Sequence, residues 1–372
     1  METVFACGAL CDAGLLRVIL GAEAPVPETA TLSAYKAHWS QGERDFSLLP
    51  APERQVAGAL LQGLNALQLA RLTFFEESRD RTSRRVRVRH AGQDDDVLTF
   101  LNKSLDTSPG EVPIQGDMEY NRDLMLLVAK EIMTCMGQIP AEQMVSRRSM
   151  IQARAAARLA ARQSVPADVR CDLSAEDVEV LSEDAPHSGF FVTKDYTLRH
   201  PQFSGGKSAP VRREVFVATD AAIVLPYDPK RDRVLLVEQF RMGPFGRGDP
   251  KPWMLEPVAG RVDVGETPDQ TAIRECQEEA GLHLKHLEHI ASHYCSPGCS
   301  TEYFHCFLGI CDLPDMMQGT GGLKTEHEDI RTHVLSYEAA MGLLKTGEAD
   351  NGPLILSLIW LSRERDRLRA SA

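Results

Sequence analysis

Residues 260–282, GRVDVGETPDQTAIRECQEEAGL, constrain the fold of this chain more than any other stretch. Pro268 and Asp269 suit the first turn of a helix, and Gly281 suits its end. Between them, apolar residues recur at helical spacing and would face a core: Ala272, Ile273, Cys276 and Ala280. The sequence therefore predicts an amphipathic helix from about residue 269 to residue 280.

Three acidic residues of this predicted helix share one face. Glu275, Glu278 and Glu279 stand at positions i, i+3 and i+4, where helical side chains are neighbours. Carboxylates so close together repel each other unless a positive group lies between them. Mg²⁺ is a hard cation with oxygen ligands that often bridges carboxylates and substrate phosphates. The alternative is a solvated acidic face neutralised by Arg274, and Glu266 with the flanking glycines favours the metal site.

The same stretch fits G-x5-E-x7-R-E-U-x-E-E-x-G-U at every specified position, with Cys276 as the one soft match to the apolar position U. The stretch therefore resembles the Nudix box. The resemblance implies hydrolysis of a nucleoside diphosphate linked to another moiety, with Mg²⁺ as cofactor and Mn²⁺ as a possible substitute. It also implies roles for box residues. The implied metal ligands are the backbone carbonyl of Ala259 with Glu275 and Glu279. Glu278 would be a further ligand or a close neighbour of the ligands. Glu278 and Arg274 are also candidate catalytic residues.

Segments outside the box, over roughly residues 170–372, resemble the ADP-ribose pyrophosphatase subgroup. Pro297 lies 16 positions after Gly281 in the segment YCSPGCSTE, 294–302. An acidic patch runs into a predicted strand in TEHEDIRTHVLS, 325–336. Further similar segments stand upstream of the box: 189–200, 211–216 and 237–241. The resemblance implies ADP-ribose as substrate, with AMP and ribose 5-phosphate as products.

The subgroup resemblance also implies roles for loop and strand residues. Glu326 matches the general base that acts on the attacking water, and Glu328 would bind metal or support the loop. Phe190 and Arg213 match residues that sandwich the adenine, although Phe190 could be core and Arg213 a surface ion-pair residue. Further substrate-binding candidates are Arg241, for the diphosphate or ribose, and Pro297 and Glu302 of the loop.

The composition is that of an acidic protein. Lys plus Arg is 41 and Asp plus Glu is 53, which gives a net charge of −12. This charge argues against broad electrostatic binding to nucleic acid or to an anionic membrane. No run approaches the roughly 20 apolar residues of a membrane span, and the N-terminus has Glu2 with no basic region, so we expect a strand and turn there and no signal peptide.

The nine cysteines favour a reducing compartment. Their number is odd and no CxxC occurs, which indicates neither a disulfide framework nor an ordinary zinc site. Cys295, Cys299, Cys306 and Cys311 could be imagined as a zinc cluster with nearby histidines. We expect instead buried thiols in a cytoplasmic protein.

The first part of the chain predicts a separate domain. We place domain one at 1–163, a linker at 164–170 and domain two at 171–372, because Pro166 and small polar residues end the preceding helical pattern. Strands at 4–10, 54–64, 84–90 and 96–102, with helices at 65–78, 121–137 and 141–162, resemble the gamma-glutamylcyclotransferase-like fold. In the helix 146–163, the spaced arginines predict a solvated or interdomain face: Arg147, Arg154, Arg158 and Arg162.

The match to that fold is partial. The glycine turn is C-G-A-L, so Gly8 stands between Cys7, where tyrosine is usual, and Ala9, where a hydroxyl is usual. Glu76 keeps the position of the catalytic glutamate, but the aspartate before it is lost. We expect a ligand-binding or architectural module. The alternative is a glutamyl cyclotransferase with Glu76 as acid/base.

The expected fold class is α/β (α+β): a mixed α/β barrel followed by a Nudix α/β/α sandwich with a mixed sheet. The resemblance implies a homodimer through the Nudix domain. Two other functions stay open for the second domain. One is hydrolysis of another nucleoside diphosphate compound, such as a GDP-sugar or NADH, and the other is a non-catalytic ADP-ribose sensor.

Overall fold

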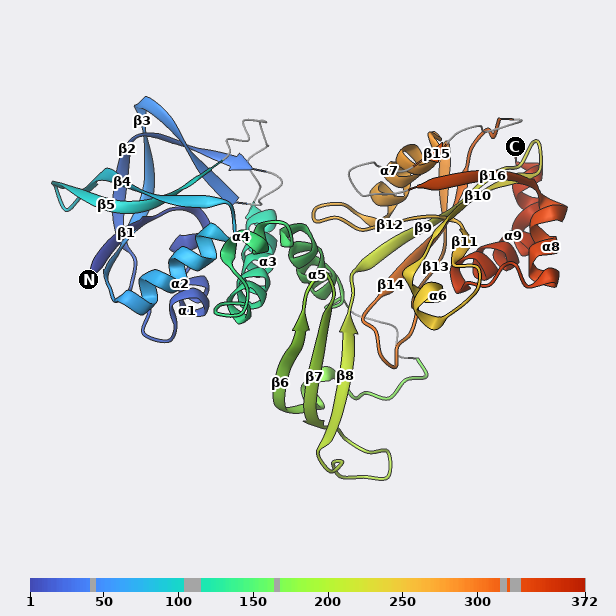
Figure 1. Ribbon diagram of the computed structural model, residues 1–372, viewed down its shortest axis with the longest axis horizontal. Helices are drawn as coiled ribbons and strands as arrows, with labels where there is room; N and C mark the ends of the chain where they lie inside the picture. Colours follow the sequence, from blue (N-terminus) through green and yellow to red (C-terminus); the bar gives the residue numbers. More distant parts are fainter. Residues whose placement is uncertain (41–44, 104–114, 164–167, 315–319, 322–328, 372) are drawn as a thin grey trace. The chain divides into compact units, whose positions relative to one another are not determined.

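The computed structural model describes residues 1–40, 45–103, 115–163, 168–314, 320–321 and 329–371 (Figure 1). The chain forms two compact units. The first comprises Met1–Cys171 with Ser188–Phe190, and the second comprises Asp172–His187 with Phe191–Ala372.

The first unit contains a closed barrel with the strand order β1-β3-β2-β4-β5, which confirms the expected mixed α/β barrel. Its core includes Phe5, Leu32, Leu60 and Val88, all with at most 2% of their surface exposed. The strands are β1 (Glu2–Ala6), β2 (Glu28–Ser40), β3 (Asp45–Leu64), β4 (Arg81–His90) and β5 (Gln93–Asn102).

Helices accompany the barrel in the first unit. Asn65 begins α2 with a capping box, because its side chain accepts from the Gln68 amide while the Gln68 side chain accepts from the Asn65 amide. The prediction of a single helix at 141–162 is wrong, because the helix is interrupted between residues 145 and 148 and forms two separate helices. The helices are η1 (Gly8–Cys11), α1 (Ala13–Leu20), α2 (Ala66–Glu77), α3 (Gln115–Thr134), α4 (Ala141–Val145) and α5 (Arg148–Ala160).

The second unit is built on an eight-stranded mixed sheet with the order β13-β14-β9-β10-β16-β15, with β12 paired to β9 and β11 to β10. The β9–β14 pair is parallel, and the β9 pairs with β12 and β10 are antiparallel. The strands are β9 (Asp220–Asp228), β10 (Arg233–Phe240), β11 (Trp253–Glu256), β12 (Val258–Arg261), β13 (His286–Tyr294), β14 (Tyr303–Ile310), β15 (Thr320–Gly321) and β16 (Ile330–Ser336).

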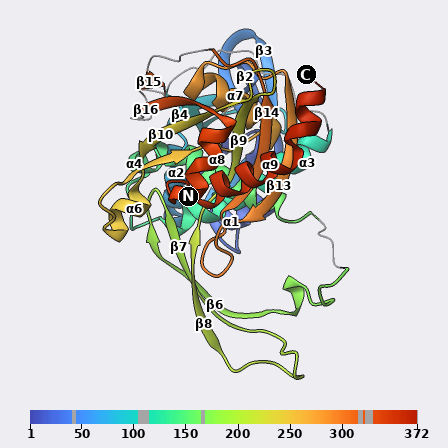
Figure 2. The ribbon, with the colours of Figure 1, turned by 90° about the vertical axis from the view of Figure 1, so that its right-hand side faces the viewer.

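Helices cover both faces of this sheet, which confirms the expected α/β/α sandwich (Figure 2). Ala222 and Val224 of β9 pack in one core with α7 (Pro268–Ala280). Leu225 and Tyr227, which point to the other face because side chains alternate along a strand, pack with α8 (Tyr337–Thr346) and α9 (Gly352–Ala370).

Smaller elements complete the second unit. A separate antiparallel ribbon pairs β7 (Val192–Arg199) with β8 (Val211–Val217), and β6 (Glu179–Ser188) lies beside β7 in the same sheet. The remaining helices are η2 (Ala175–Asp177) and α6 (Met242–Arg247). Among the residues that the structure describes, no helix is both long and apolar enough to cross a membrane.

Candidate active site

The predicted box helix forms as α7 and begins and ends where the sequence places it. The Thr267 side chain accepts from the Gln270 amide, Pro268 occupies the first turn, and Gly281 ends the helix in the left-handed region at φ 60°. One expectation about its faces is wrong: Ile273 is 50% exposed, while Glu279 is only 2% exposed. The buried stripe therefore includes a carboxylate of the box.

Arg274 organises the acidic residues of the box. Its Nε and Nη2 donate to the two carboxylate oxygens of Glu266 at 2.9 and 3.0 Å, a bidentate pair. Its Nη1 donates to Glu275 Oε1 at 2.7 Å and to Glu278 Oε2 at 2.9 Å. These hydrogen bonds raise the pKa of Arg274, and the bonds from Arg274 hold the pKa of Glu266 below its usual value. Arg274 thus fixes the loop before α7 to the acidic face of α7.

Two box carboxylates converge on the backbone of β12. A Cβ on Gly260 would lie 1.8 Å from Glu275 Oε1 and 1.9 Å from its Cδ, so only glycine leaves room for this carboxylate. Glu279 Oε2 accepts from the Ala259 amide at 3.4 Å. Since α7 packs on β12, residues about 15 to 20 positions apart in the chain meet here. Sequence reasoning named all four residues but gave no reason for the glycine.

The donor set fits a hard divalent cation. Glu275 and Glu279 bring carboxylate oxygens to the Ala259–Gly260 backbone, and oxygen ligands of this kind are those that Mg²⁺ takes in proteins. Glu278, like Glu275, accepts from Arg274, and its side chain is 30% exposed. Within the described part of the chain, no group of three His, Cys, Asp or Glu residues is arranged to hold a metal ion. The other acidic candidates, Glu326 and Glu328, lie outside the described residues.

Arg241 pairs with a residue that the sequence did not single out. Its Nε donates to Glu256 Oε2 at 2.7 Å, and the side chains are 39% and 16% exposed. Burial raises the pKa of Glu256, while Arg241 opposes that shift. The pair joins the end of β10 to β11. The sequence could not indicate Glu256 as the partner of Arg241, because their proximity depends on the strand register, in which Val237 lies opposite Glu256.

The two adenine candidates lie on exposed backbone segments. Phe190 is 60% exposed and belongs to the first compact unit. Arg213 lies on β8 in the second unit, and its Nη1 donates to the Arg212 carbonyl at 2.9 Å. The alternative that Phe190 is core is wrong, because most of its surface is exposed.

The segment of residues 294–302 is tied to β8. The Phe216 amide donates to the Cys299 carbonyl at 2.8 Å, and the Thr301 amide donates to the Phe216 carbonyl at 3.0 Å. Pro297 is exposed. Cys295 Sγ donates to Glu302 Oε2 at 2.9 Å; burial and this carboxylate raise the pKa of Cys295 to about 11. Glu302 is therefore engaged with a thiol that stays protonated at neutral pH.

The other cysteines divide between core and surface. The expectation of buried thiols is right for Cys306 and Cys311 and wrong for the exposed Cys295 and Cys299. Of the remaining cysteines, Cys7 is half-buried, and Cys11 and Cys171 are exposed. The buried ones are Cys135, Cys276, Cys306 and Cys311.

In the first unit, Glu76 lies near the end of α2 and pairs with two arginines. It is fully buried, and its carboxylate oxygens accept from Arg79 Nη1 at 3.2 Å and Arg81 Nη1 at 3.0 Å. Two guanidinium groups thus bind its carboxyl group inside the fold. Gly8 keeps the left-handed turn, at φ 61°, but the turn carries Cys7 and Ala9.

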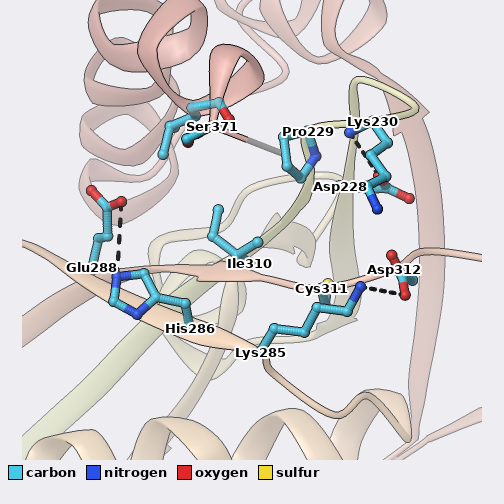
Figure 3. Close-up of a pocket in the computed structure, with 11 residues that line it drawn as sticks. Asp228, Pro229, Lys230, Lys285, His286, Glu288, Ile310, Cys311, Asp312 and Ser371 are labelled. Atoms are coloured by element: carbon cyan, nitrogen blue, oxygen red, sulfur yellow. Dashed lines mark hydrogen bonds and ion pairs between the residues drawn. The ribbon is translucent and has the colours of Figure 1, made fainter.

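A cavity of about 370 Å³ lies in the second unit (Figure 3), and none of the box residues lines it. Its charged side chains bind each other, as in the Lys285–Asp312 pair at 2.5 Å and the His286–Glu288 pair at 4.0 Å. We therefore place the candidate active site at α7 and β12 and not at this cavity.

Comparison with known proteins shows the family to which the second unit is similar. The NUDIX domain family matches residues 217–358. An ADP-ribose pyrophosphatase of Haemophilus influenzae is 40% identical over 200 residues, which cover 53% of this chain and 92% of that protein. An ADP-ribose pyrophosphatase of Escherichia coli K12 is 39% identical over 193 residues, 52% of this chain and 91% of that protein. A GDP-mannose pyrophosphatase of Enterobacter is 27% identical over 184 residues, 50% of this chain and 94% of that protein. The chain belongs to the Nudix family of hydrolases, and its class is that of the Nudix pyrophosphohydrolases.

Proposed function

We propose that this protein hydrolyses the diphosphate bond of ADP-ribose to AMP and ribose 5-phosphate with Mg²⁺ as cofactor. The observation that carries the proposal is the convergence of Glu275 and Glu279 on the Ala259–Gly260 backbone, within a box that is complete at every specified position. The choice of ADP-ribose rests on the relatives at 39 and 40% identity, which are named ADP-ribose pyrophosphatases.

The chemistry needs positive charge and an activated water. A diphosphate repels an incoming nucleophile, and Mg²⁺ bound at the carboxylates would neutralise the phosphates and lower the pKa of a bound water; Mn²⁺ could substitute. Arg274 keeps Glu275 and Glu278 in place through direct hydrogen bonds. In a chain of net charge −12, Arg241 and Arg213 supply further local cations for the substrate.

We assign the general base to Glu326, with Glu328 as a metal ligand or loop support. A base acts on the transition state, so Glu326→Gln should lower kcat by about 100-fold to 10,000-fold and change KM little. Glu328→Gln should mainly weaken the dependence on Mg²⁺. If Glu328→Gln abolishes turnover and Glu326→Gln leaves it nearly intact, the general base is Glu328 and not Glu326.

We assign adenine binding to Phe190 and Arg213, contact with the diphosphate or ribose to Arg241, and the substrate loop to the segment with Pro297 and Glu302. Phe190→Ala should raise KM for ADP-ribose. The same change should leave KM unaltered for a diphosphate substrate that lacks a nucleobase. A KM increase of equal size for both substrates would remove Phe190 from the adenine site.

The second candidate substrate is a GDP-sugar, because GDP-mannose pyrophosphatases also match this chain. The two are separated by hydrolysis of ADP-ribose, GDP-mannose and NADH under equal Mg²⁺, with chromatographic identification of the products. The proposal requires the highest kcat/KM for ADP-ribose and equimolar AMP and ribose 5-phosphate. A tight complex with ADP-ribose without turnover would indicate a sensor.

We further propose a cytoplasmic homodimer that associates through the Nudix domain and binds neither nucleic acid nor membrane. The support is the family resemblance together with the net charge of −12, which disfavours polyanionic partners. Light scattering coupled to size-exclusion chromatography should give twice the chain mass of 41.1 kDa. A mass of one chain at micromolar concentration would rule the dimer out.

A further inference from the structure

The Arg241 side chain is held at one of its three nitrogens. Its Nε donates to Glu256 Oε2 at 2.7 Å, and this hydrogen bond orients the guanidinium group. Within the part of the chain that the structure describes, its Nη1 and Nη2 have no hydrogen-bond partner, and the side chain is 39% exposed. Guanidinium N–H groups arranged side by side can bind two oxygens of a phosphate group at once.

The backbone of Arg241 is fixed as well. Its amide donates to the Pro252 carbonyl at 2.9 Å, and its carbonyl accepts from the Phe245 amide at 3.4 Å at the start of α6. The ion pair with Glu256 therefore orients a side chain whose backbone is already anchored. A guanidinium group that is ordered in advance loses less freedom when an anion binds to it.

Glu256 is suited to hold an arginine in place. It lies on β11, where its backbone is in register with Val237 of β10, and its side chain is only 16% exposed. Burial raises the pKa of Glu256, the pairing with Arg241 lowers it, and the charge of Asp350 adds to the increase. Because this carboxyl group is largely withdrawn from water, its attraction to Arg241 is screened less than that of an exposed pair.

The pair lies on the face of the sheet that carries the box helix. Leu255 packs in the core with α8 and α9, so Glu256, the next residue of the strand, points to the other face. Val237, which lies opposite Glu256, packs in the core with α7. Glu256 also precedes Ala259 by only three residues. The Arg241–Glu256 pair and the acidic face of α7 are therefore on the same side of the sheet.

From these contacts we infer that Glu256 is a positioning residue that directs the two Nη groups of Arg241 to the phosphate oxygens of the substrate. The inference rests on the proposed function, in which Arg241 contacts the diphosphate or ribose, and it assigns this contact to the diphosphate. In this role Glu256 acts through Arg241 and does not touch the substrate. A carboxylate that only neutralised Arg241 would have the opposite effect, because its removal would strengthen the binding of an anion.

The kinetic test uses the chain of 372 residues with three variants. Glu256→Met removes the carboxyl group at similar side-chain length, and Glu256→Gln keeps an acceptor oxygen without the charge. The matched control is Glu288→Met, because the Glu288 side chain is 21% exposed and pairs with Arg367 at 2.6 Å, away from the box.

With ADP-ribose and Mg²⁺, Glu256→Met should raise KM about tenfold at nearly constant kcat, because the contact is made in the bound substrate as well as in the transition state. Glu256→Gln should recover part of the loss, and Glu288→Met should match the wild type. An unchanged or lowered KM in Glu256→Met, or a fall in kcat alone, would overturn the inference.

A double-mutant comparison separates positioning from general damage. In an Arg241→Met background, the Glu256 carboxylate loses its arginine and can only repel an anionic substrate. Adding Glu256→Met to this background should therefore lower KM or leave it unchanged. If the increase in KM caused by Glu256→Met persists without Arg241, Glu256 acts elsewhere and the inference is wrong.

A measurement without ADP-ribose keeps the inference separate from the proposed function. The probe is methylenediphosphonate, a diphosphate mimic with a P–C–P bridge, titrated with Mg²⁺ present and followed by calorimetry. Its Kd should rise about tenfold in Glu256→Met and stay unchanged in Glu288→Met. Equal affinity in the wild type and Glu256→Met, or no binding to the wild type, would overturn the inference whatever the kinetics. Absence of ADP-ribose hydrolysis beside the expected change in Kd would instead refute the proposed function and leave the diphosphate contact in place.

Discussion

Replacing Gly260 by alanine should abolish most of the activity without unfolding the protein. The added Cβ would lie 1.9 Å from Cδ of Glu275 and 2.4 Å from its Cγ. Carbon atoms in contact are separated by about 3.5 Å, so the carboxylate must retreat by about 1.6 Å. A misplacement of about 1 Å in an active site can cost about 100-fold in rate. We therefore expect kcat/KM to fall by at least about 100-fold, and the Mg²⁺ concentration for half-maximal rate to rise.

The stability of this variant should change little, because the obstructing group is the end of a side chain and alanine is compatible with the strand backbone of β12. Urea unfolding should give a change below about 1 kcal/mol, the usual range for such a substitution. The matched control is Gly309→Ala in β14 of the same sheet, where a Cβ would meet Leu284 Cδ2 at 2.8 Å and Val224 Cγ2 at 3.0 Å. That variant should lose about 1 kcal/mol or more of stability and keep its Mg²⁺ dependence. Wild-type kinetics in Gly260→Ala would refute the placement of Glu275.

Four further outcomes follow from the same contacts. Glu279→Gln should lower turnover by orders of magnitude at limiting Mg²⁺ while circular dichroism stays native; near-normal turnover would exclude Glu279 as a ligand. Glu76→Gln should destabilise the first unit by about 3 kcal/mol in thermal unfolding, because it leaves two buried arginines without their carboxylate, and release of 5-oxoproline from gamma-glutamyl peptides should be absent before and after the change. Glu266 has a pKa below 4.5 in the folded protein, so its contribution to stability is present above pH 4.5 and is lost as pH falls through the lower folded value; Glu266→Gln should flatten the acid side of the stability curve, and an unchanged slope would contradict this. A fragment that starts near Pro166 should fold and hydrolyse ADP-ribose, whereas a fragment that is soluble only with the first domain present would contradict the predicted domain boundary.

Local signals in the sequence predicted the box helix well. Pro268, Asp269 and Gly281 act within one turn of the helix ends, so their preferences alone predict both ends of α7, while the Thr267 cap was found only in the structure. The shared face of Glu275 and Glu279 follows from helical spacing. The burial of Glu279 and the contact of Glu275 with Gly260 could not be read in the same way, because they depend on how α7 packs on β12.

The N-terminal unit shows the same limit. Glu76 has Arg79 three positions later, a local signal that a paired carboxylate was possible, but its complete burial depends on the fold around it. Arg154 lies in a run of regularly spaced arginines that resembles a solvated face. Its burial depends on Glu131 and on the Phe190 carbonyl, 23 and 36 positions away in the chain. Helical spacing alone could not identify either of these two partners of Arg154.

The most direct test of the account is hydrolysis of ADP-ribose in ¹⁸O-labelled water by the chain of 372 residues, with and without a chelator of divalent metal ions. Mass spectrometry of the products identifies the cleaved bond and the phosphorus atom attacked. We predict AMP and ribose 5-phosphate in equal amounts, the label in AMP, and no products with the chelator. Intact ADP-ribose after incubation with Mg²⁺, or turnover that survives the chelator, would contradict the proposed metal-dependent site at Glu275 and Glu279.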